Sequence, residues 1–213
     1  MVLGDEQHKI NIKIDDENIE QVTEFKYLGV DIHCNGYQEI EINNRVDKAM
    51  KIFHAMGQSF INKKEISRKT KINVFKTIYR PILTFGCETW ILNKQQKSKI
   101  QAVEMRYLRR TKGVTRYDRI RNTDIREELE IESTLEFIER RQLSWWGHLQ
   151  RMDNKRPVKK IWEAKVQKQK KRGRPRKTWD GVVNEILLKR GTTWEEARRT
   201  SKNKKEWTKL VYS

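Results

Sequence analysis

The chain has 213 residues, of which 47 are Lys or Arg and 29 are Asp or Glu, and its formal net charge is +18. Hydrophobic residues make up 36%, against about 45–50% in typical globular chains, so we expect one ordinary core, alone or with a weakly folded tail. The longest stretches without a charged residue span nine positions, whereas a membrane-spanning helix needs about 20, which excludes a membrane protein. The first residues lack the apolar segment of a secretory signal, and two cysteines cannot form a disulfide framework. We therefore expect an intracellular protein that is not secreted.

The charge is unevenly distributed along the chain. Residues 1–45 contain 10 acidic and 4 basic side chains, a net charge of −6, which leaves +24 for the remainder. Residues 151–177 contain 13 basic and 2 acidic side chains, a net charge of +11. Such a concentration favours a polyanionic partner, because Lys and Arg that neutralise phosphates release condensed counterions. A solvated basic surface without a specific partner is the alternative.

The N-terminal residues have the pattern of a small β-hairpin. Isoleucines alternate with polar residues over residues 10–14, as in a half-buried strand, and residues 15–18 fit a turn. A second β-rich run covers residues 25–32, in which Gly29 predicts a bulge or a close backbone approach. Asn35-Gly36 then predicts another turn.

After Gly36 the apolar residues recur at spacings of three and four, which is typical of helices. Helices are predicted around residues 42–57, 67–82, 100–112, 123–129, 133–149, 179–188, 194–199 and 206–211. Pro81 is expected to kink or end the second of these, because it lacks an amide donor. The predicted fold is mainly α with a small N-terminal β-hairpin. The predicted organisation is a hairpin over 1–36, a helical domain over 37–150, a basic linker over 151–177 and short helices over 178–213.

Side chains with catalytic potential are few. Asp15-Asp16 resembles part of the carboxylate cluster that holds magnesium in nucleotidyl transfer, but a solvated turn is the stronger interpretation. The spacing of His33-Cys34 and Cys87 supports neither a zinc site nor a Cys–His dyad. No glycine-rich phosphate loop occurs. We predict no catalytic residue, no metal site and no cofactor for this chain.

The basic region has features typical of nucleic-acid binding. Residues 170–177 contain Arg-Gly-Arg-Pro, which resembles an AT-hook, and a basic linker is an equally supported alternative. Trp162 has the position of an aromatic between phosphate-binding cations, whereas at least one residue of Trp145-Trp146 is expected in the core. Lys168–Lys177 also has the length of a nuclear import signal, so a nuclear location is a further interpretation.

Five separated segments together resemble one known family. They are EFKYLGVDI, FKTIYRPILTFGCETWIL, RYLRRTKGVTRYDRIRN, RRQLSWWGHLQRM and GRPRKTWDGVVNEIL. In this order they resemble the C-terminal third of non-LTR, LINE-type retrotransposon reverse transcriptases, most closely the RTE- and jockey-like elements. The resemblance extends from Ile10 to the C-terminus.

The resemblance implies a role for each segment. The helices from Ile42 to about Leu108 would form a thumb-like bundle along a template–primer duplex. The region from Arg109 onward would be a basic tail with short helices that binds template RNA or target DNA. The residues that match the family's primer grip are Phe25, Lys26, Tyr27, Leu28 and Gly29.

The family's endonuclease, fingers and palm, including its aromatic-x-Asp-Asp strand, correspond to segments upstream of Met1. We therefore expect a truncated fragment without polymerase activity of its own, and magnesium would belong only to the full-length parent family. A reverse transcriptase or nuclease acting alone is the first alternative. The second is an interaction remnant that self-associates through apolar surface exposed by truncation, or a chain that does not fold stably.

The predicted partners are RNA, DNA or both. The residues predicted to contact them are Arg106, Arg109, Arg110, Lys112, Arg151, Lys155, Arg156, Lys159, Lys160, Trp162, Lys170, Lys171, Arg172, Arg174, Arg176 and Lys177.

Overall fold

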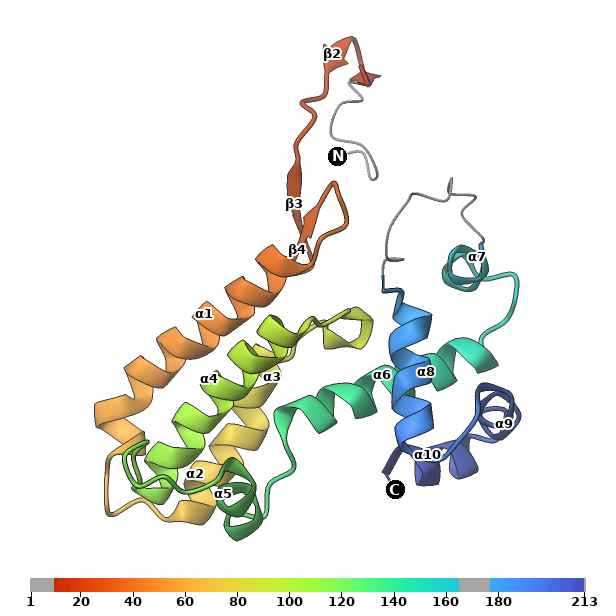
Figure 1. Ribbon diagram of the computed structural model, residues 1–213. Coiled ribbons are helices and arrows are strands. Elements are labelled where there is room, and N and C mark those ends of the chain that lie inside the picture. Colours follow the sequence, from red (N-terminus) through yellow and green to blue (C-terminus); the bar gives the residue numbers. More distant parts are fainter. Residues whose placement is uncertain (1–9, 165–176, 213) are drawn as a thin grey trace. The chain divides into compact units, whose positions relative to one another are not determined.

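The computed structural model describes residues 10–164 and 177–212, which form two compact units. Unit 1 is built from residues up to Gly86 and from Leu92–Thr134, and unit 2 from Cys87–Ile91 and from Leu135 onward. Within the described ranges the chain is mostly helical, with four short strands near its N-terminal end (Figure 1). The predicted fold class, mainly α with a small N-terminal β structure, is confirmed.

The first hairpin is formed by β1 (Lys13–Ile14) and β2 (Glu17–Asn18), which pair antiparallel. Asp15 and Asp16 connect them and both have positive φ, 47° and 65°, which is the geometry of a type I′ turn. The predicted turn at these two aspartates is therefore confirmed. The predicted half-burial of the isoleucines is wrong, because Ile10, Ile12 and Ile14 are exposed. A two-stranded hairpin has no second layer of its own to cover them.

The second hairpin is formed by β3 (Glu24–Tyr27) and β4 (Val30–His33). Leu28 and Gly29 connect the strands, with φ values of 47° and 83°. The sequence predicted one β-rich run through this region, with a bulge or a close backbone approach at Gly29. The single run is wrong, because the chain turns at Leu28-Gly29. Positive φ at both positions makes a tight two-residue turn, so one β-rich run folds back on itself.

The helices of unit 1 are α1 (Glu39–Met56), α2 (Arg68–Val74), α3 (Arg80–Leu83), α4 (Lys94–Lys112) and α5 (Asn122–Glu128), with π-helical turns η1 (Gly57–Ile61) and η2 (Phe75–Tyr79). α1 and α4 lie side by side (Figure 1). The Ser67 side chain accepts a hydrogen bond from Thr70 N and starts α2 as predicted. Pro81 does not end this helix, which continues to Leu83. The π-helical turn η2 ends two residues before the proline, whose missing amide donor disturbs the helical pattern.

Three aromatic rings, packed with their planes inclined to one another, lie in the buried core of unit 1. The ring centroids of Tyr79 and Tyr107 are 4.7 Å apart, and those of Phe75 and Tyr107 are 5.3 Å apart. The Tyr79 hydroxyl donates to Val103 O at 3.2 Å, and the Tyr107 hydroxyl donates to Lys71 O at 2.9 Å. Burial raises the pKa of both phenols. These contacts hold α4 against α2 and η2. The opposite face of α4 is therefore held in place by the packing of the core.

A buried carboxylate ties α4 to the next segment of unit 1. Glu104 is fully buried, and its Oε2 accepts a hydrogen bond from Arg126 Nη2 of α5 at 2.7 Å. Its Oε1 accepts from the backbone N–H of Thr134 at 2.8 Å. One α4 side chain therefore fixes both α5 and the end of the segment that follows it.

Unit 2 contains the 3₁₀ turn η3 (Cys87–Thr89) and the helices α6 (Thr134–Arg151), α7 (Pro157–Glu163), α8 (Trp179–Lys189), α9 (Trp194–Thr200) and α10 (Lys204–Tyr212). Helix α7 lies inside the stretch predicted to be a basic linker. Trp146, Leu187 and Trp207 belong to the hydrophobic core of this unit. Burial of Trp146 confirms that one member of the Trp145-Trp146 pair is a core residue.

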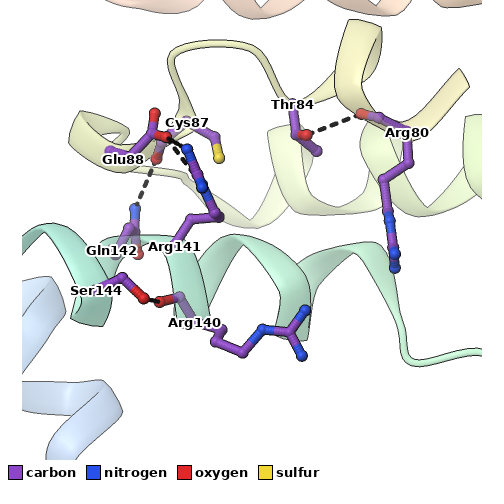
Figure 2. A network of polar contacts seen from close by, with 8 residues as sticks. All are labelled: Arg80, Thr84, Cys87, Glu88, Arg140, Arg141, Gln142 and Ser144. Atoms are coloured by element: carbon purple, nitrogen blue, oxygen red, sulfur yellow. Dashed lines mark hydrogen bonds and ion pairs between the residues drawn. The ribbon is translucent and has the colours of Figure 1, made fainter. Parts of the chain in front are cut away.

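The short η3 segment is attached to α6 by side chains of the helix. Gln142 Nε2 donates to Cys87 O at 3.3 Å and to Trp90 O at 2.7 Å, and Arg141 forms an ion pair with Glu88 (Figure 2). These contacts explain why residues 87–91 belong to unit 2 although they lie between two segments of unit 1.

Candidate nucleic-acid interface

A groove with a volume of about 920 Å³ lies on the surface of unit 1. Its walls come from the end of α1, from α4 and from the loop that follows α4. Arg106, Arg109 and Arg110 of α4 line it, together with Arg116 of the loop. None of the described residues that line the groove is an Asp or a Glu. Four guanidinium groups therefore surround a cavity without a carboxylate in its wall.

Other lining groups are suited to contact bases and sugars. Phe53 and His54 contribute aromatic rings, whose centroids are 5.5 Å apart in an edge-to-face arrangement. Carboxamides line the groove as well, and each offers both a donor and an acceptor. They belong to Gln58, Asn62, Gln101 and Asn122.

Arg109 adds a positive charge to the groove and also holds the loop that forms part of its wall. Its Nη1 donates to Thr115 O at 3.2 Å, and its Nη2 donates to Ile120 O at 2.9 Å and to Asn122 Oδ1 at 2.7 Å. These acceptors lie at both ends of the loop between α4 and α5. Arg109 therefore closes the loop and holds it against α4.

A carboxylate inside the loop adds a second constraint. Asp118 Oδ2 accepts hydrogen bonds from Thr115 N at 2.6 Å and from Thr115 Oγ1 at 2.9 Å. These donors lower the pKa of Asp118, with a smaller contribution from the positive charge of Arg109. The only acidic side chain of residues 113–121 is thus engaged within the loop.

The other α4 cations differ in how far the fold engages them. Arg106 is exposed, and its Nη1 lies 3.7 Å from the Met50 sulfur. Arg110 Nε donates to Asn62 Oδ1 at 2.5 Å, across the groove wall. Lys112 does not line the groove, because it forms an ion pair with Glu128. The structure thus brings three of the four predicted α4 cations together.

Two of the predicted cations of unit 2 support the fold. Arg151 Nη1 donates to Ser201 O at 2.8 Å, and burial lowers the pKa of its guanidinium. Lys159 is only 4% exposed, and its ammonium donates to Leu149 O at 2.8 Å. Lys159 therefore does not present its charge at the surface. Among described residues 151–164, the exposed cations are Lys155, Arg156 and Lys160.

Trp162 is half-buried and packs against the hydrophobic core of unit 2. Its indole Nε1 donates to Asp180 Oδ1 at 3.0 Å, and Lys159 Nζ lies 4.7 Å from the ring centroid. Lys177 forms an ion pair with Glu185 at 2.5 Å. The remaining predicted contacts, the AT-hook-like sequence included, lie outside the described residues. They are Lys170, Lys171, Arg172, Arg174 and Arg176.

The five primer-grip-like residues lie on the β3–β4 hairpin. Phe25, Lys26, Tyr27 and Leu28 are exposed, whereas Gly29 is half-buried. The base of the turn is fixed to α1, because Arg45 Nη2 donates to Gly29 O at 2.5 Å. Glu41 completes the anchor, since its Oε1 pairs with Arg45 Nε at 2.5 Å and its Oε2 accepts from Asp31 N at 2.9 Å.

The described residues form neither a metal centre nor a membrane-spanning helix. Among residues 10–164 and 177–212, no group of three His, Cys, Asp or Glu side chains is arranged to hold a metal ion. Within the same ranges, no helix combines the length and the apolar character needed to cross a bilayer.

Sequence reasoning missed several groove residues. Arg116, His54 and the carboxamides were not singled out. The closeness of Arg116 and Asn122 to α4 depends on how the loop folds back, and that of His54, Gln58 and Asn62 depends on how the end of α1 packs. The available signal was the string Lys-Gly-Val-Thr-Arg-Tyr after α4. Gly113 ends this helix with a φ of 83°, and its N–H donates to Arg109 O at 2.9 Å.

Comparison with known proteins gives a relative in Caenorhabditis elegans. This uncharacterized protein, which is named as transposon-derived, is 26% identical over 201 residues, covering 91% of the present chain and 71% of the relative. The similarity supports a transposon origin for the chain. No family model matches the sequence. No solved structure matches it.

Proposed function

We propose that this chain is a nucleic-acid-binding protein derived from a retrotransposon reverse transcriptase, and that the groove of unit 1 holds the phosphate backbone. The observation that carries the proposal is the group of four arginines, Arg106, Arg109, Arg110 and Arg116, around a groove without a carboxylate in its wall. Guanidinium groups bind phosphate oxygens through paired N–H donors. The net charge of +18 adds long-range attraction for a polyanion.

The ancestry part of the proposal rests on two observations. The five segments that resemble LINE-type reverse transcriptases include the primer-grip-like hairpin, the thumb-like helices and the loop that carries Arg116. The relative named as transposon-derived extends over most of the chain. In this proposal the groove lies in the thumb-like part, and the exposed cations Lys155, Arg156 and Lys160 provide further phosphate contacts.

The partner in this proposal is RNA or DNA, and the chain by itself is not a polymerase. The segments that carry the resemblance do not include the family's aromatic-x-Asp-Asp strand. Primer extension on an RNA template with magnesium tests this part directly. We expect no incorporation of nucleotides by the purified chain, and any template-dependent extension would show an activity beyond binding.

The groove itself is tested by a matched pair of variants. Arg106→Ala/Arg116→Ala removes two exposed groove cations, whereas Lys76→Ala/Lys94→Ala removes two exposed cations that do not line the groove. Both double variants change the net charge by the same amount. We expect fluorescence anisotropy with labelled 20-nucleotide RNA and DNA to show much weaker binding for the groove variant alone. An equal loss of affinity in both variants would mean that binding reflects non-specific attraction to the net charge and not contacts in the groove.

Self-association is a second candidate property, favoured by exposed apolar side chains on the two hairpins. Ile12, Ile14, Phe25 and Leu28 are all exposed. Large exposed apolar patches commonly mark interaction surfaces. Light scattering over a range of concentrations measures this property independently of nucleic-acid binding, and a monomer at all concentrations would contradict it.

A further inference from the structure

Tyr117 is the most exposed large hydrophobic side chain among the described residues, with 93% of its surface accessible. It lies at the tip of the loop between α4 and α5, directly after the groove residue Arg116. A tyrosine ring has a large apolar face that is normally at least partly covered in a folded protein. Here almost the whole ring is presented to solvent beside a cationic groove.

The backbone that carries Tyr117 is held in place on both sides. Arg109 binds the carbonyl oxygens of Thr115 and Ile120, as described above. Asp118 binds the N–H and the hydroxyl of Thr115, and Arg119 N donates to Arg116 O at 3.3 Å. An exposed ring on a constrained loop loses little conformational entropy when it binds a ligand.

The charges around this ring are positive. Arg116, Arg119 and Arg121 are exposed in the same loop, and its one carboxylate, Asp118, is bound to Thr115. Aromatic rings between phosphate-binding cations are the arrangement by which proteins bind single strands, because each base offers a π-face for stacking.

We infer that Tyr117 stacks on an unpaired base of a strand whose phosphates lie in the groove, which makes this a site for single-stranded nucleic acid. The inference rests on the proposed function and specifies its ligand. A base inside a duplex has both faces covered by its neighbours, so apart from the two terminal base pairs only an unpaired base is open to the ring. RNA and DNA share this chemistry, and oligonucleotides of both kinds distinguish them in the test.

The test compares variants of the full chain on a 20-nucleotide single strand and on a duplex of the same length. Tyr117→Ala should weaken binding of the single strand about 5- to 140-fold, which corresponds to 1–3 kcal/mol per stacked base, and should leave duplex binding unchanged. Tyr117→Phe keeps the ring and should stay within about twofold of the original chain. Tyr37→Ala removes another exposed tyrosine, which lies outside the loop between α4 and α5, and should change neither affinity.

Tyr117→Trp adds a direct readout, because stacking on a base quenches indole fluorescence. Addition of the single strand should quench the emission of this variant beyond any change in the original chain, which has seven tryptophans of its own, and with the same midpoint as binding. The duplex should cause no such additional quenching. If the original chain binds neither ligand, the proposed function and this inference both fail. A second outcome is that Arg106→Ala/Arg116→Ala weakens binding, but Tyr117→Ala either leaves the affinity for the single strand unchanged or lowers the affinity for both ligands equally. This outcome overturns only the stacking inference.

Discussion

The indole of Trp207 lies so close to Gly147 that no side chain fits between α10 and α6 at this point. A Cβ atom on Gly147 would lie 2.0 Å from Trp207 Nε1 and 2.4 Å from its Cδ1. The indole is also fixed by a hydrogen bond, because Nε1 donates to Leu143 O at 3.1 Å. The contact explains a glycine in the middle of α6, where it would otherwise weaken the helix.

We predict that Gly147→Ala destabilises unit 2 by about 1–3 kcal/mol, because the methyl group must displace a buried indole and break its hydrogen bond. Urea unfolding followed by tryptophan fluorescence measures the change. Gly57→Ala is the matched control, since Gly57 has helical φ and ψ of −56° and −57° and no atom within 4 Å of an added Cβ. The control should be neutral or stabilise by about 0.4–1 kcal/mol. A Gly147→Ala chain as stable as the original would contradict the packing described here.

Glu104 offers a second test of stability, in unit 1. Glu104→Ala leaves Arg126 and the Thr134 N–H without their acceptor, and we expect a loss of about 3–5 kcal/mol in the free energy of unfolding. Glu127→Ala removes an exposed carboxylate from α5 and should change stability by less than about 0.5 kcal/mol. Chemical denaturation of both variants gives the comparison. If both variants change the free energy of unfolding by similarly small amounts, the buried Glu104–Arg126 ion pair contributes little to stability.

Acid should loosen the loop that carries Tyr117. Hydrogen bonds from Thr115 lower the pKa of Asp118, so the folded loop favours the ionised carboxylate. Its stabilising contribution is present above the ordinary value of 3.8 and is lost as the pH falls through the lowered pKa. An NMR titration of the Thr115 amide should therefore have a midpoint below 3.8, and Asp118→Ala should abolish it. A midpoint at or above 3.8 would rule out this hydrogen bond as the constraint on the loop.

The two thiols should be nearly unreactive in the folded chain. Cys34 and Cys87 are both buried, and burial raises the pKa of Cys87 to about 12. Because the thiolate is the reactive form, we expect a disulfide reagent at pH 8 to modify both slowly, and rapidly once the chain is unfolded in urea. Immediate modification of either cysteine in the native protein would contradict its burial.

Local signals predicted the helices well because their causes are local. The Ser67 cap and the glycine at 113 marked helix ends that the structure has, and apolar periodicity located the helices after them. The β-rich run over residues 25–32 was misread because its turn depends on positive φ at Leu28, which a leucine rarely adopts.

The groove was only half visible in the sequence. The clustered cations of α4 were evident, but the arrival of Arg116 beside them depends on the three hydrogen bonds of Arg109 to residues 6 to 13 positions away. Charge alone also gave no way to separate Lys159, buried and bound to Leu149 O, from its exposed neighbours Lys155, Arg156 and Lys160. Which cations face solvent is decided by tertiary packing.

The salt dependence of binding tests the phosphate-binding groove most directly. For the original chain, the logarithm of the association constant should fall linearly with the logarithm of salt concentration, with a slope of about −0.7 per phosphate contact on single strands. Arg106→Ala/Arg116→Ala should make this slope shallower by about 1.4, since two contacts are lost. Lys76→Ala/Lys94→Ala should leave it nearly unchanged. A groove variant with the slope and affinity of the original chain would contradict the assignment of this groove as the nucleic-acid interface.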